Sequence, residues 1–506
     1  MRFCAVILFA SLSAGLFARE AAHLSLAELQ QALSKHVREE KFAAAQWGIK
    51  VVSLDSGAVL FETNAQKLLK PASNGKIFTA ALALDVLGSE FRIRTSLLSK
   101  KRPDANGILD GDLIVYGRGD PSLAARFRDG SYSNLLGRVV EALRSAGVKE
   151  IAGDLVGDET FFSGPRMGSN WSWDDLQYYY GAEISALTIQ DNVADLFFKP
   201  GRKIGDPCLV TTKPDKVPLE FVNRTRTTET NITASISVHR PVGERRVYLS
   251  GTLPENHGAY EDAVTVPDPA SWYVQTLRTA LVEDGIRVRG NVRTRSWPQD
   301  PPLNPGDFED IAFTESPPLR GILPKMMKPS QNLYAQLLFL QVGARANGRL
   351  TEDSAVRALR DFAKRADINP DEVLLDEGSG LSRACLVTPN AVVRLLEFMA
   401  KGSHAEPFVA SFPTPGEGTL RNRFPHWRGE AGTKLGLKAK TGSIRYVTAL
   451  SGYLRTAAGE QLAFSILLNA FDPGAASARD EVDVIVRALA NLGEKSRDRT
   501  VEHLVP

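Results

Sequence analysis

Residues 70–88 read KPASNGKIFTAALALDVLG, and the interpretation of the rest of the chain starts from this stretch. Apolar residues at helical spacing predict a helix from about Ser73 to Leu87, which Gly88 can cap. Ser73 and Lys76 are three positions apart, so they share one face of that helix. An amine with a lowered pKa can take the proton of a serine hydroxyl, which makes the pair a candidate nucleophile and base.

The Ser-x-x-Lys spacing is common by chance, and a capping serine followed by a solvated lysine explains it when it stands alone. Two further short motifs follow along the chain, Ser330-Gln331-Asn332 and Lys440-Thr441-Gly442. Taken singly, the first is a common turn sequence and the second a common strand end. Their occurrence together and in this order indicates a shared site.

The three motifs supply the groups that acyl transfer through a serine requires. Ser330 can relay a proton to a leaving amine, because a hydroxyl both donates and accepts hydrogen bonds. Asn332 can hold Lys76 through its carbonyl oxygen and a substrate amide through its other side. Lys440 is expected to place a fixed positive charge that binds a substrate carboxylate and helps to keep Lys76 neutral.

The Lys-Thr-Gly strand is the predicted substrate-binding edge. An extended peptide can bind along such an edge as an additional strand. We expect Gly442 to leave room for the substrate backbone, because it has no side chain. The backbone N–H groups of Ser73 and Ser443 are the candidate oxyanion hole. The predicted substrate-binding residues are Lys440, Thr441, Gly442 and Ser443.

With these motifs the chain resembles the low-molecular-mass class C serine penicillin-binding proteins, specifically the D-alanyl-D-alanine carboxypeptidase/endopeptidase family of penicillin-binding protein 4. The likeness covers nearly all of the chain, including the long separation of the first two motifs. In the second motif Gln331 stands where Asp is usual, and we expect this side chain to point away from the cleft. Four secondary stretches are also similar: Gly119-Asp120-Pro121-Ser122-Leu123, Tyr179-Tyr180-Gly181-Ala182, Glu377-Gly378-Ser379-Gly380-Leu381-Ser382-Arg383 and Gly416-Glu417-Gly418-Thr419-Leu420.

The resemblance implies a serine D-Ala-D-Ala carboxypeptidase, a D-Ala endopeptidase or both, which acts on peptidoglycan stem peptides through a Ser73 acyl-enzyme. It implies β-lactam antibiotics as inhibitors, no cofactor and no metal, and a location in the periplasm. The balance of the two activities, the stem-peptide preference and the oligomeric state stay open.

The implied fold is of the α/β class, with a β-lactamase/transpeptidase-like domain built from an antiparallel sheet, helices and a helical subdomain. A long mixed α/β insert of one or two domains interrupts it. We expect the first part of the domain at 24–95, the insert at 96–304 and the second part at 305–494. The expected elements of the two parts are helices at 26–39, 319–401 (a helical subdomain) and 479–492, and strands at 48–54, 58–62, 437–442, 446–454 and 461–469.

The chain begins with Arg2 and an apolar run from Phe3 to Phe17, which is short for a membrane span. This pattern predicts a signal peptide at 1–18 with cleavage after Ala18, and an uncleaved anchor is the alternative. No later apolar stretch reaches membrane-spanning length. A polar tail is expected at 495–506.

The composition bears on which classes of partner the protein can bind. Lys and Arg number 61 and Asp and Glu 59, so a formal net charge of +2 gives no reason to expect nucleic-acid binding. Three cysteines, Cys4, Cys208 and Cys385, exclude a cysteine-rich scaffold, and whether the last two pair stays open.

Other enzyme classes fit the sequence poorly. A Ser-His-Asp hydrolase lacks its G-x-S-x-G elbow, and a zinc peptidase lacks its His-Glu-x-x-His motif. Two alternatives stay open: a peptidoglycan-binding envelope protein with little or no catalysis, and a β-lactamase-like esterase. Labelling by a fluorescent penicillin separates the first from an active enzyme, and substrate profiling separates the second.

Overall fold

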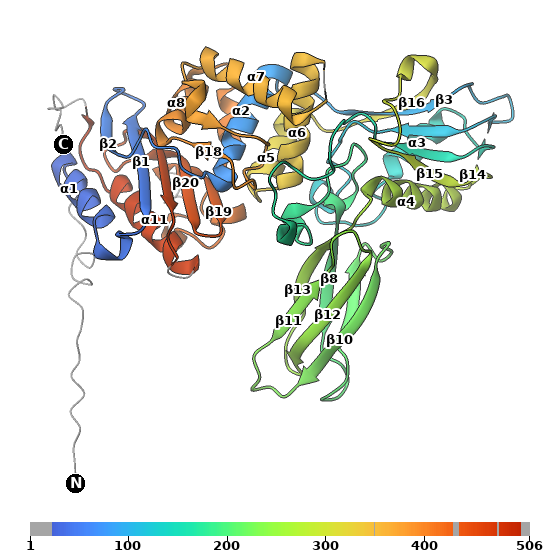
Figure 1. The fold of residues 1–506 in the computed structure, drawn as a ribbon, viewed down its shortest axis with the longest axis horizontal. Helices are drawn as coiled ribbons and strands as arrows, with labels where there is room; N and C mark the ends of the chain where they lie inside the picture. Colours follow the sequence, from blue (N-terminus) through green and yellow to red (C-terminus); the bar gives the residue numbers. More distant parts are fainter. Residues whose placement is uncertain (1–22, 349, 429–434, 473–474, 497–506) are drawn as a thin grey trace, which may run out of the picture.

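The computed structural model of the protein describes residues 23–348, 350–428, 435–472 and 475–496 (Figure 1). The predicted signal peptide at 1–18 lies outside these ranges, as does the predicted tail after residue 496. The first two residues of the expected tail at 495–506, Lys495 and Ser496, lie within the described residues. Ser496 is buried, and its backbone N–H donates to the Glu460 carboxylate at 3.1 Å.

A five-stranded antiparallel sheet in the order β19-β20-β21-β1-β2 forms the centre of the domain built from the two ends of the chain (Figure 1). β1 pairs with β21 from Gln46 opposite Asn469 to Ser53 opposite Leu462. This pairing confirms that strands from both ends of the chain share one sheet. The strands are β1 (Gln46–Ser53), β2 (Val59–Thr63), β19 (Lys438–Ile444), β20 (Val447–Arg455) and β21 (Gln461–Asn469).

Helices cover both faces of this sheet, which explains why β20 and β21 are buried almost throughout instead of alternating. One face packs against α1 (Leu26–Val37) and α11 (Ala475–Ala490). The other packs against α2 (Gly75–Leu87) and α8 (Pro389–Lys401). These helices lie close to the predicted positions.

α2 is the most enclosed of these helices, because every residue from Gly75 to Leu84 is buried. A helix that is apolar on all sides belongs in the centre of a domain. It packs among α5 (Leu319–Met327), α6 (Asn332–Asn347), α7 (Glu352–Arg365) and α9 (Ala405–Ala410), in addition to α8. The helical subdomain expected at 319–401 therefore surrounds the helix that starts at the candidate nucleophile.

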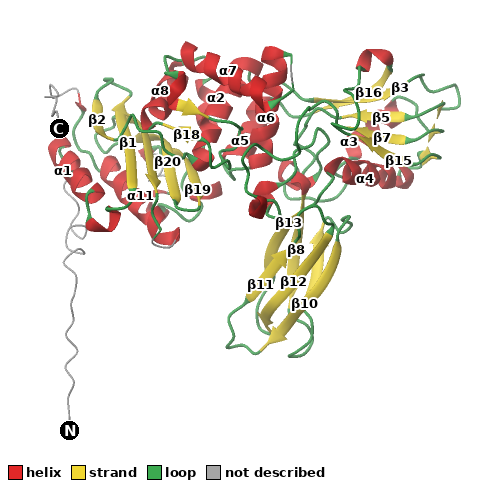
Figure 2. Cartoon of the chain, viewed as in Figure 1, coloured by secondary structure: helices red, strands yellow, loops and turns green. Residues whose placement is uncertain are grey.

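The middle of the chain forms a second five-stranded sheet in the order β15-β7-β5-β3-β16 (Figure 2). Its outer strand β16 (Glu309–Glu315) pairs with β3 (Arg94–Ser99), although the expected insert of 96–304 excluded β16. Where the chain enters and leaves this region, Ser316 N–H donates to the Ile93 carbonyl at 2.9 Å. We propose insert boundaries at these two residues.

A structural repeat is present in this region, which contains two helix-glycine-strand units with their glycines at Gly147 and Gly285. A pair of short strands occurs three times along the chain, and the three pairs lie side by side in two sheets. β6 pairs in parallel with β4 and β14, while β7 pairs in parallel with β5 and β15. The sequence carries a matching short repeat that the sequence analysis missed, Gly-Asp-Leu at 111 and 153 and Gly-Asn-Val at 290. The elements are β4 (Ile108–Leu109), β5 (Leu113–Tyr116), α3 (Gly137–Ser145), β6 (Glu150–Ile151), β7 (Leu155–Asp158), α4 (Pro269–Glu283), β14 (Arg287–Val288) and β15 (Val292–Arg295).

A β-module projects from the body of the molecule, at the bottom of Figure 1. It consists of two three-stranded sheets, in the orders β10-β12-β11 and β13-β8-β9. The strands are β8 (Val193–Lys199), β9 (Leu209–Lys213), β10 (Glu220–Thr228), β11 (Ser235–His239), β12 (Arg246–Pro254) and β13 (Tyr260–Thr265).

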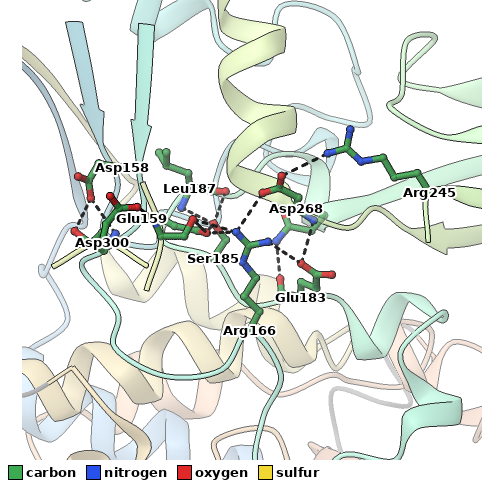
Figure 3. Close-up of polar contacts among 12 residues, drawn as sticks. Asp158, Glu159, Arg166, Glu183, Ser185, Leu187, Arg245, Asp268 and Asp300 are labelled. Atoms are coloured by element: carbon green, nitrogen blue, oxygen red, sulfur yellow. Dashed lines mark hydrogen bonds and ion pairs between the residues drawn. The ribbon is translucent and has the colours of Figure 1, made fainter. Parts of the chain in front are cut away.

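Arg166 ties together the segments at the base of this module (Figure 3). Its guanidinium contacts Glu159 at 2.5 Å, Asp268 at 3.2 Å and Glu183 at 3.5 Å. Glu183 precedes β8, and Asp268 follows β13 and precedes α4. One half-buried guanidinium thus links the two ends of the module to the segment after β7.

Cys208 and Cys385 are both free and buried, and they belong to different hydrophobic cores. Among the described residues, no helix combines the length and the apolar character needed to cross a membrane.

Candidate active site

Ser73 lies in a short 3-10 turn (Ala72–Asn74) that leads directly into α2. The turn is fixed to the sheet, because Asn74 Nδ2 donates to Ser451 Oγ of β20 at 2.7 Å. Ser73 borders a cleft of about 680 Å³ between the helical subdomain, the edge strand β19 and the segment at residues 174–180. The Ser73 hydroxyl is therefore held at the start of α2, beside the sheet, where a ligand in the cleft can reach it.

Lys76 is fully buried in the first turn of α2. Its Nζ contacts Ser73 Oγ at 2.9 Å, Asn332 Oδ1 at 2.5 Å and the Ser379 carbonyl oxygen at 2.7 Å. Burial lowers the pKa of Lys76 to about 7, and the nearby Glu377 carboxylate opposes part of this shift. A large fraction of Lys76 is therefore neutral near pH 7, as a general base requires.

Asn332 is the first residue of α6 and lies 256 positions from Lys76 in the sequence. Its carbonyl oxygen holds Lys76, as expected. Its Nδ2 donates to the Tyr180 carbonyl at 2.8 Å, so a contact expected to be made with a substrate amide is made with the inserted region. This bond fixes the orientation of the Asn332 amide.

Gln331 does not border the cleft, in agreement with the expectation, but it is buried and does not face solvent. It is the N-cap residue of α6, and its side-chain oxygen accepts a hydrogen bond from Leu333 N–H at 3.3 Å. Asp is a preferred N-cap residue, so Asp in place of Gln331 would also cap α6 and would leave the cleft unchanged.

Lys440 and Ser330 form the other side of the site. Lys440 is fully buried on β19, and its Nζ donates to Ser330 Oγ and to the Thr441 carbonyl, both at 2.8 Å. Burial, and the proximity of Lys76, hold the pKa of Lys440 well below its usual value. This lowered pKa disfavours the ammonium form of Lys440 in the site without a ligand, and the fixed positive charge expected there stays a prediction.

Gly442 has a different role from the one expected. A Cβ atom there would lie 2.5 Å from the Pro71 carbonyl oxygen and 3.2 Å from Ala72 Cβ. The missing side chain thus makes room for the turn that carries Ser73 and not for a substrate. The absence of a side chain at Gly442 brings β19 and Ser73 together.

β19 is the outer strand of the sheet, and its free edge borders the cleft. Ala439 N–H donates to the Pro413 carbonyl at 3.2 Å, so it points away from the paired strand β20. Because strand residues alternate, the N–H groups of Thr441 and Ser443 point to the same free edge. The Thr441 hydroxyl donates to Thr419 Oγ1 at 2.8 Å.

The structure brings all eight predicted residues to this cleft or its wall: Ser73, Lys76, Ser330, Asn332, Lys440, Thr441, Gly442 and Ser443. Sequence reasoning missed the carbonyl groups of Tyr180 and Ser379 and the hydroxyl of Thr419. Each lies in one of the secondary stretches noted above, and the resemblance of those stretches was the only available signal. Charged side chains of both signs also line the cleft: Asp174, Asp175, Arg383, Arg445 and Arg479.

The comparisons with known proteins agree with this geometry. The sequence model of the D-Ala-D-Ala carboxypeptidase 3 (S13) family matches residues 29–492. A D-alanyl-D-alanine carboxypeptidase of Actinomadura sp. (strain R39) is 32% identical over 478 residues, which cover 92% of this chain and 85% of the relative. D-alanyl-D-alanine carboxypeptidase DacB of Haemophilus influenzae is 28% identical over 450 residues, 88% of this chain and 90% of the relative.

Among solved structures, penicillin binding protein 4 from Haemophilus influenzae superposes with a TM-score of 0.76 at 27% identity, over 93% of this chain and 100% of that chain. A complex of the same protein with a β-lactam has a TM-score of 0.69 at 25% identity, over 92% of this chain and 99% of that chain.

A serine beside a buried, partly neutral lysine, at the edge of an antiparallel sheet covered by helices, defines a serine hydrolase of the penicillin-binding, transpeptidase-like class. The family model matches nearly the whole chain, so the protein can be assigned to one family within this class. The chain belongs to the D-Ala-D-Ala carboxypeptidase 3 (S13) family of serine peptidases that act on peptidoglycan.

Proposed function

We propose that the protein cleaves D-Ala-D-Ala and D-Ala cross-links of peptidoglycan stem peptides through an acyl-enzyme on Ser73. The observation that supports this most strongly is the contact between Ser73 Oγ and the buried Lys76 amine at 2.9 Å. Ser73 Oγ forms a bond to the carbonyl carbon of the penultimate D-Ala, and its proton passes to Lys76 Nζ. Water later hydrolyses the resulting ester.

The leaving amine needs a proton when its C–N bond breaks, and Ser330 is the proposed relay, which passes its proton to the amine and takes in exchange the proton that Lys76 received from Ser73. Its hydroxyl accepts a hydrogen bond from Lys440, which leaves its own proton free to point into the cleft. The N–H groups of Ser73 and Ser443 are the proposed donors to the oxyanion, and the free edge of β19 supports this role for Ser443.

Lys440 is the proposed anchor for the carboxylate next to the scissile bond. A carboxylate in contact with an amine favours the ammonium form. Substrate binding therefore draws a proton to Lys440, and the repulsion between two nearby charges then keeps Lys76 neutral. In this proposal, binding of the substrate carboxylate favours the neutral form of Lys76 that acts as the base.

We further propose that the protein is exported through cleavage after Ala18 and acts in the periplasm, where cross-linked stem peptides are found. β-Lactams acylate Ser73 because they present a strained amide to the same nucleophile, and the relative solved with a β-lactam is consistent with this. Both carboxypeptidase and endopeptidase activity fit the open cleft.

The test is penicillin labelling followed by mass spectrometry. One peptide, the one containing Ser73, should gain the mass of the antibiotic, and Ser73→Ala should abolish the gain. Ser131→Ala, which changes an exposed serine outside the cleft, serves as the matched control and should label normally. Release of D-Ala from a pentapeptide and cleavage of a cross-linked dimer should both be lost in Ser73→Ala. An adduct that persists in the alanine variant contradicts the assignment.

A further inference from the structure

One partner of Lys76 comes from a segment outside the three motifs. The Ser379 carbonyl, which accepts a hydrogen bond from Lys76 Nζ, lies in the loop between β17 (Val373–Leu374) and β18 (Leu386–Val387). Ser379 is fully buried, and so is Glu377. The loop therefore forms part of the wall behind the catalytic lysine.

The Glu377 carboxylate holds this loop in shape. It accepts hydrogen bonds from Gly380 N–H at 2.5 Å, Ser379 N–H at 2.7 Å and Ser382 N–H at 3.4 Å. Among the described residues, no cation lies within ion-pair distance of it. The Cys385 thiol is a further neighbour, with Sγ at 3.8 Å from Oε1 of Glu377. A buried carboxylate that accepts hydrogen bonds from several backbone N–H groups fixes the backbone around it.

Three further contacts fix the loop against α2, α6 and the nucleophile turn. Thr79 Oγ1 donates to the Gly378 carbonyl at 2.6 Å, and Gly378 N–H donates to Gln336 Oε1 at 2.8 Å. Gly380 has φ +77°, and a Cβ atom there would lie 1.9 Å from the Ala72 carbonyl oxygen. The loop thus has little freedom to move away from Lys76.

The partners of neutral Lys76 determine where its lone pair points. A neutral lysine has two N–H donors and one lone pair. The Ser379 carbonyl and Asn332 Oδ1 can only accept hydrogen bonds, so they take the two N–H groups. The Ser73 hydroxyl is the one partner that can donate, and the lone pair faces it.

We propose that Glu377 is a positioning residue, which fixes the Ser379 carbonyl and thereby directs the lone pair of Lys76 at the Ser73 proton. This inference rests on the proposed function, in which Lys76 is the base. In the step concerned, the proton moves from Ser73 Oγ to Lys76 Nζ as Oγ bonds to the substrate carbonyl carbon. Two titratable groups face Lys76, the Glu377 carboxylate and the Lys440 amine.

The main test is Glu377→Gln, with the acylation rate by a fluorescent penicillin measured from pH 5 to 9. The glutamine side chain keeps only one acceptor oxygen. Its NH2 group is itself a donor and cannot accept a hydrogen bond from a backbone N–H group, so we expect the loop to shift. We expect the plateau rate at high pH to fall about ten- to a hundredfold. The midpoint of the acidic limb should move to lower pH, because the variant loses the charge that favours protonated Lys76.

Glu460→Gln is the matched control. Glu460 is also a fully buried carboxylate of the catalytic domain, but its partners are Ser53 and Ser496. Its substitution should lower the melting temperature without changing the plateau rate or the midpoint. A purely structural role of Glu377 would give the same result as this control and would overturn the proposal.

Thr79→Val keeps the test decisive if Glu377→Gln does not fold. It removes the hydroxyl that holds the Gly378 carbonyl but no charge, so the plateau rate should fall about three- to tenfold with an unchanged midpoint. A wild-type plateau rate in folded Thr79→Val would refute positioning by the loop. Failure of the proposed function looks different, because Ser73→Ala or Lys76→Arg would then still be acylated.

Discussion

Lys76 shows how burial changes the chemistry of a single side chain. An exposed lysine is protonated at neutral pH and cannot accept a proton. In the wall of the cleft, loss of solvation brings its pKa to about 7, although a carboxylate lies nearby. Desolvation is therefore the larger of the two effects.

The pH dependence of acylation follows from this pKa. Acylation needs neutral Lys76, so the rate should rise with pH through about 7 and fall about tenfold for each pH unit below it. Lys76→Arg should lose acylation at every pH, because guanidinium stays protonated in proteins. Stopped-flow labelling with a fluorescent penicillin measures both. A flat profile between pH 5 and 8 would argue against the base role.

Lys440 permits a test of carboxylate anchoring. A charge-assisted hydrogen bond contributes about 1.5–3 kcal/mol, so Lys440→Ala should lower kcat/KM about ten- to a hundredfold. Wild type should discriminate strongly against a peptide with an amidated C-terminus, and Lys440→Ala should lose most of that discrimination. Arg445→Ala, which changes an exposed arginine of the same cleft, is the control and should keep it. If instead Arg445→Ala loses it, Arg445 holds the carboxylate.

At the scale of elements, β19 and the Ser73 turn act as a pair. The two are in contact at Gly442, where a Cβ atom would meet the Pro71 carbonyl. The two proposed oxyanion donors come one from each element, so their relative position depends on this contact.

Gly442→Ala should separate the two elements. We expect acylation to slow at least about tenfold, which corresponds to about 1.4 kcal/mol in the activation barrier, together with a lower melting temperature. Gly258→Ala is the control, because no atom lies within 4 Å of its added Cβ. Normal acylation by Gly442→Ala would show that β19 can shift without cost.

Much of this arrangement was predictable from the sequence. The hairpin of β1 and β2, the helix after Ser73 and the three terminal strands follow from local periodicity and turn residues, and the structure confirms them. The role of Gly442 was wrong because a glycine does not indicate which neighbour approaches it. The Ser379 and Tyr180 carbonyls were missed because every residue has a backbone carbonyl, and only tertiary packing selects among them.

At the scale of the whole molecule, the inserted region is packed into the catalytic domain. Tyr334 of α6 is fully buried, and its hydroxyl donates to Asp191, which also pairs with Arg126 at 2.5 Å. Asn332, two residues before Tyr334, takes its second partner from Tyr180. Contacts with the inserted region thus fix α6, the helix that begins at the Ser330-Gln331-Asn332 motif.

Tyr334→Phe should measure this attachment. A hydrogen bond to a charged group contributes about 1.5–3 kcal/mol, so the free energy of unfolding in urea should fall by about that amount. Tyr273→Phe is the control, because the buried Tyr273 hydroxyl has no hydrogen-bond partner in the described part of the chain. Its removal should leave stability unchanged or raise it. Equal losses in the two variants would mean that the Asp191 contact contributes nothing.

The pairing of β1 with β21 has a consequence for the order of assembly. β1 lies near the start of the chain, and its partner begins only at Gln461. Strand β19, with Lys440, reaches the rest of the sheet only through β20 and β21. A growing chain therefore holds Ser73 and Lys76 without the other half of their site. The proposed peptidase activity can arise only after the last strands have been synthesised, so an incomplete chain is expected to be inactive.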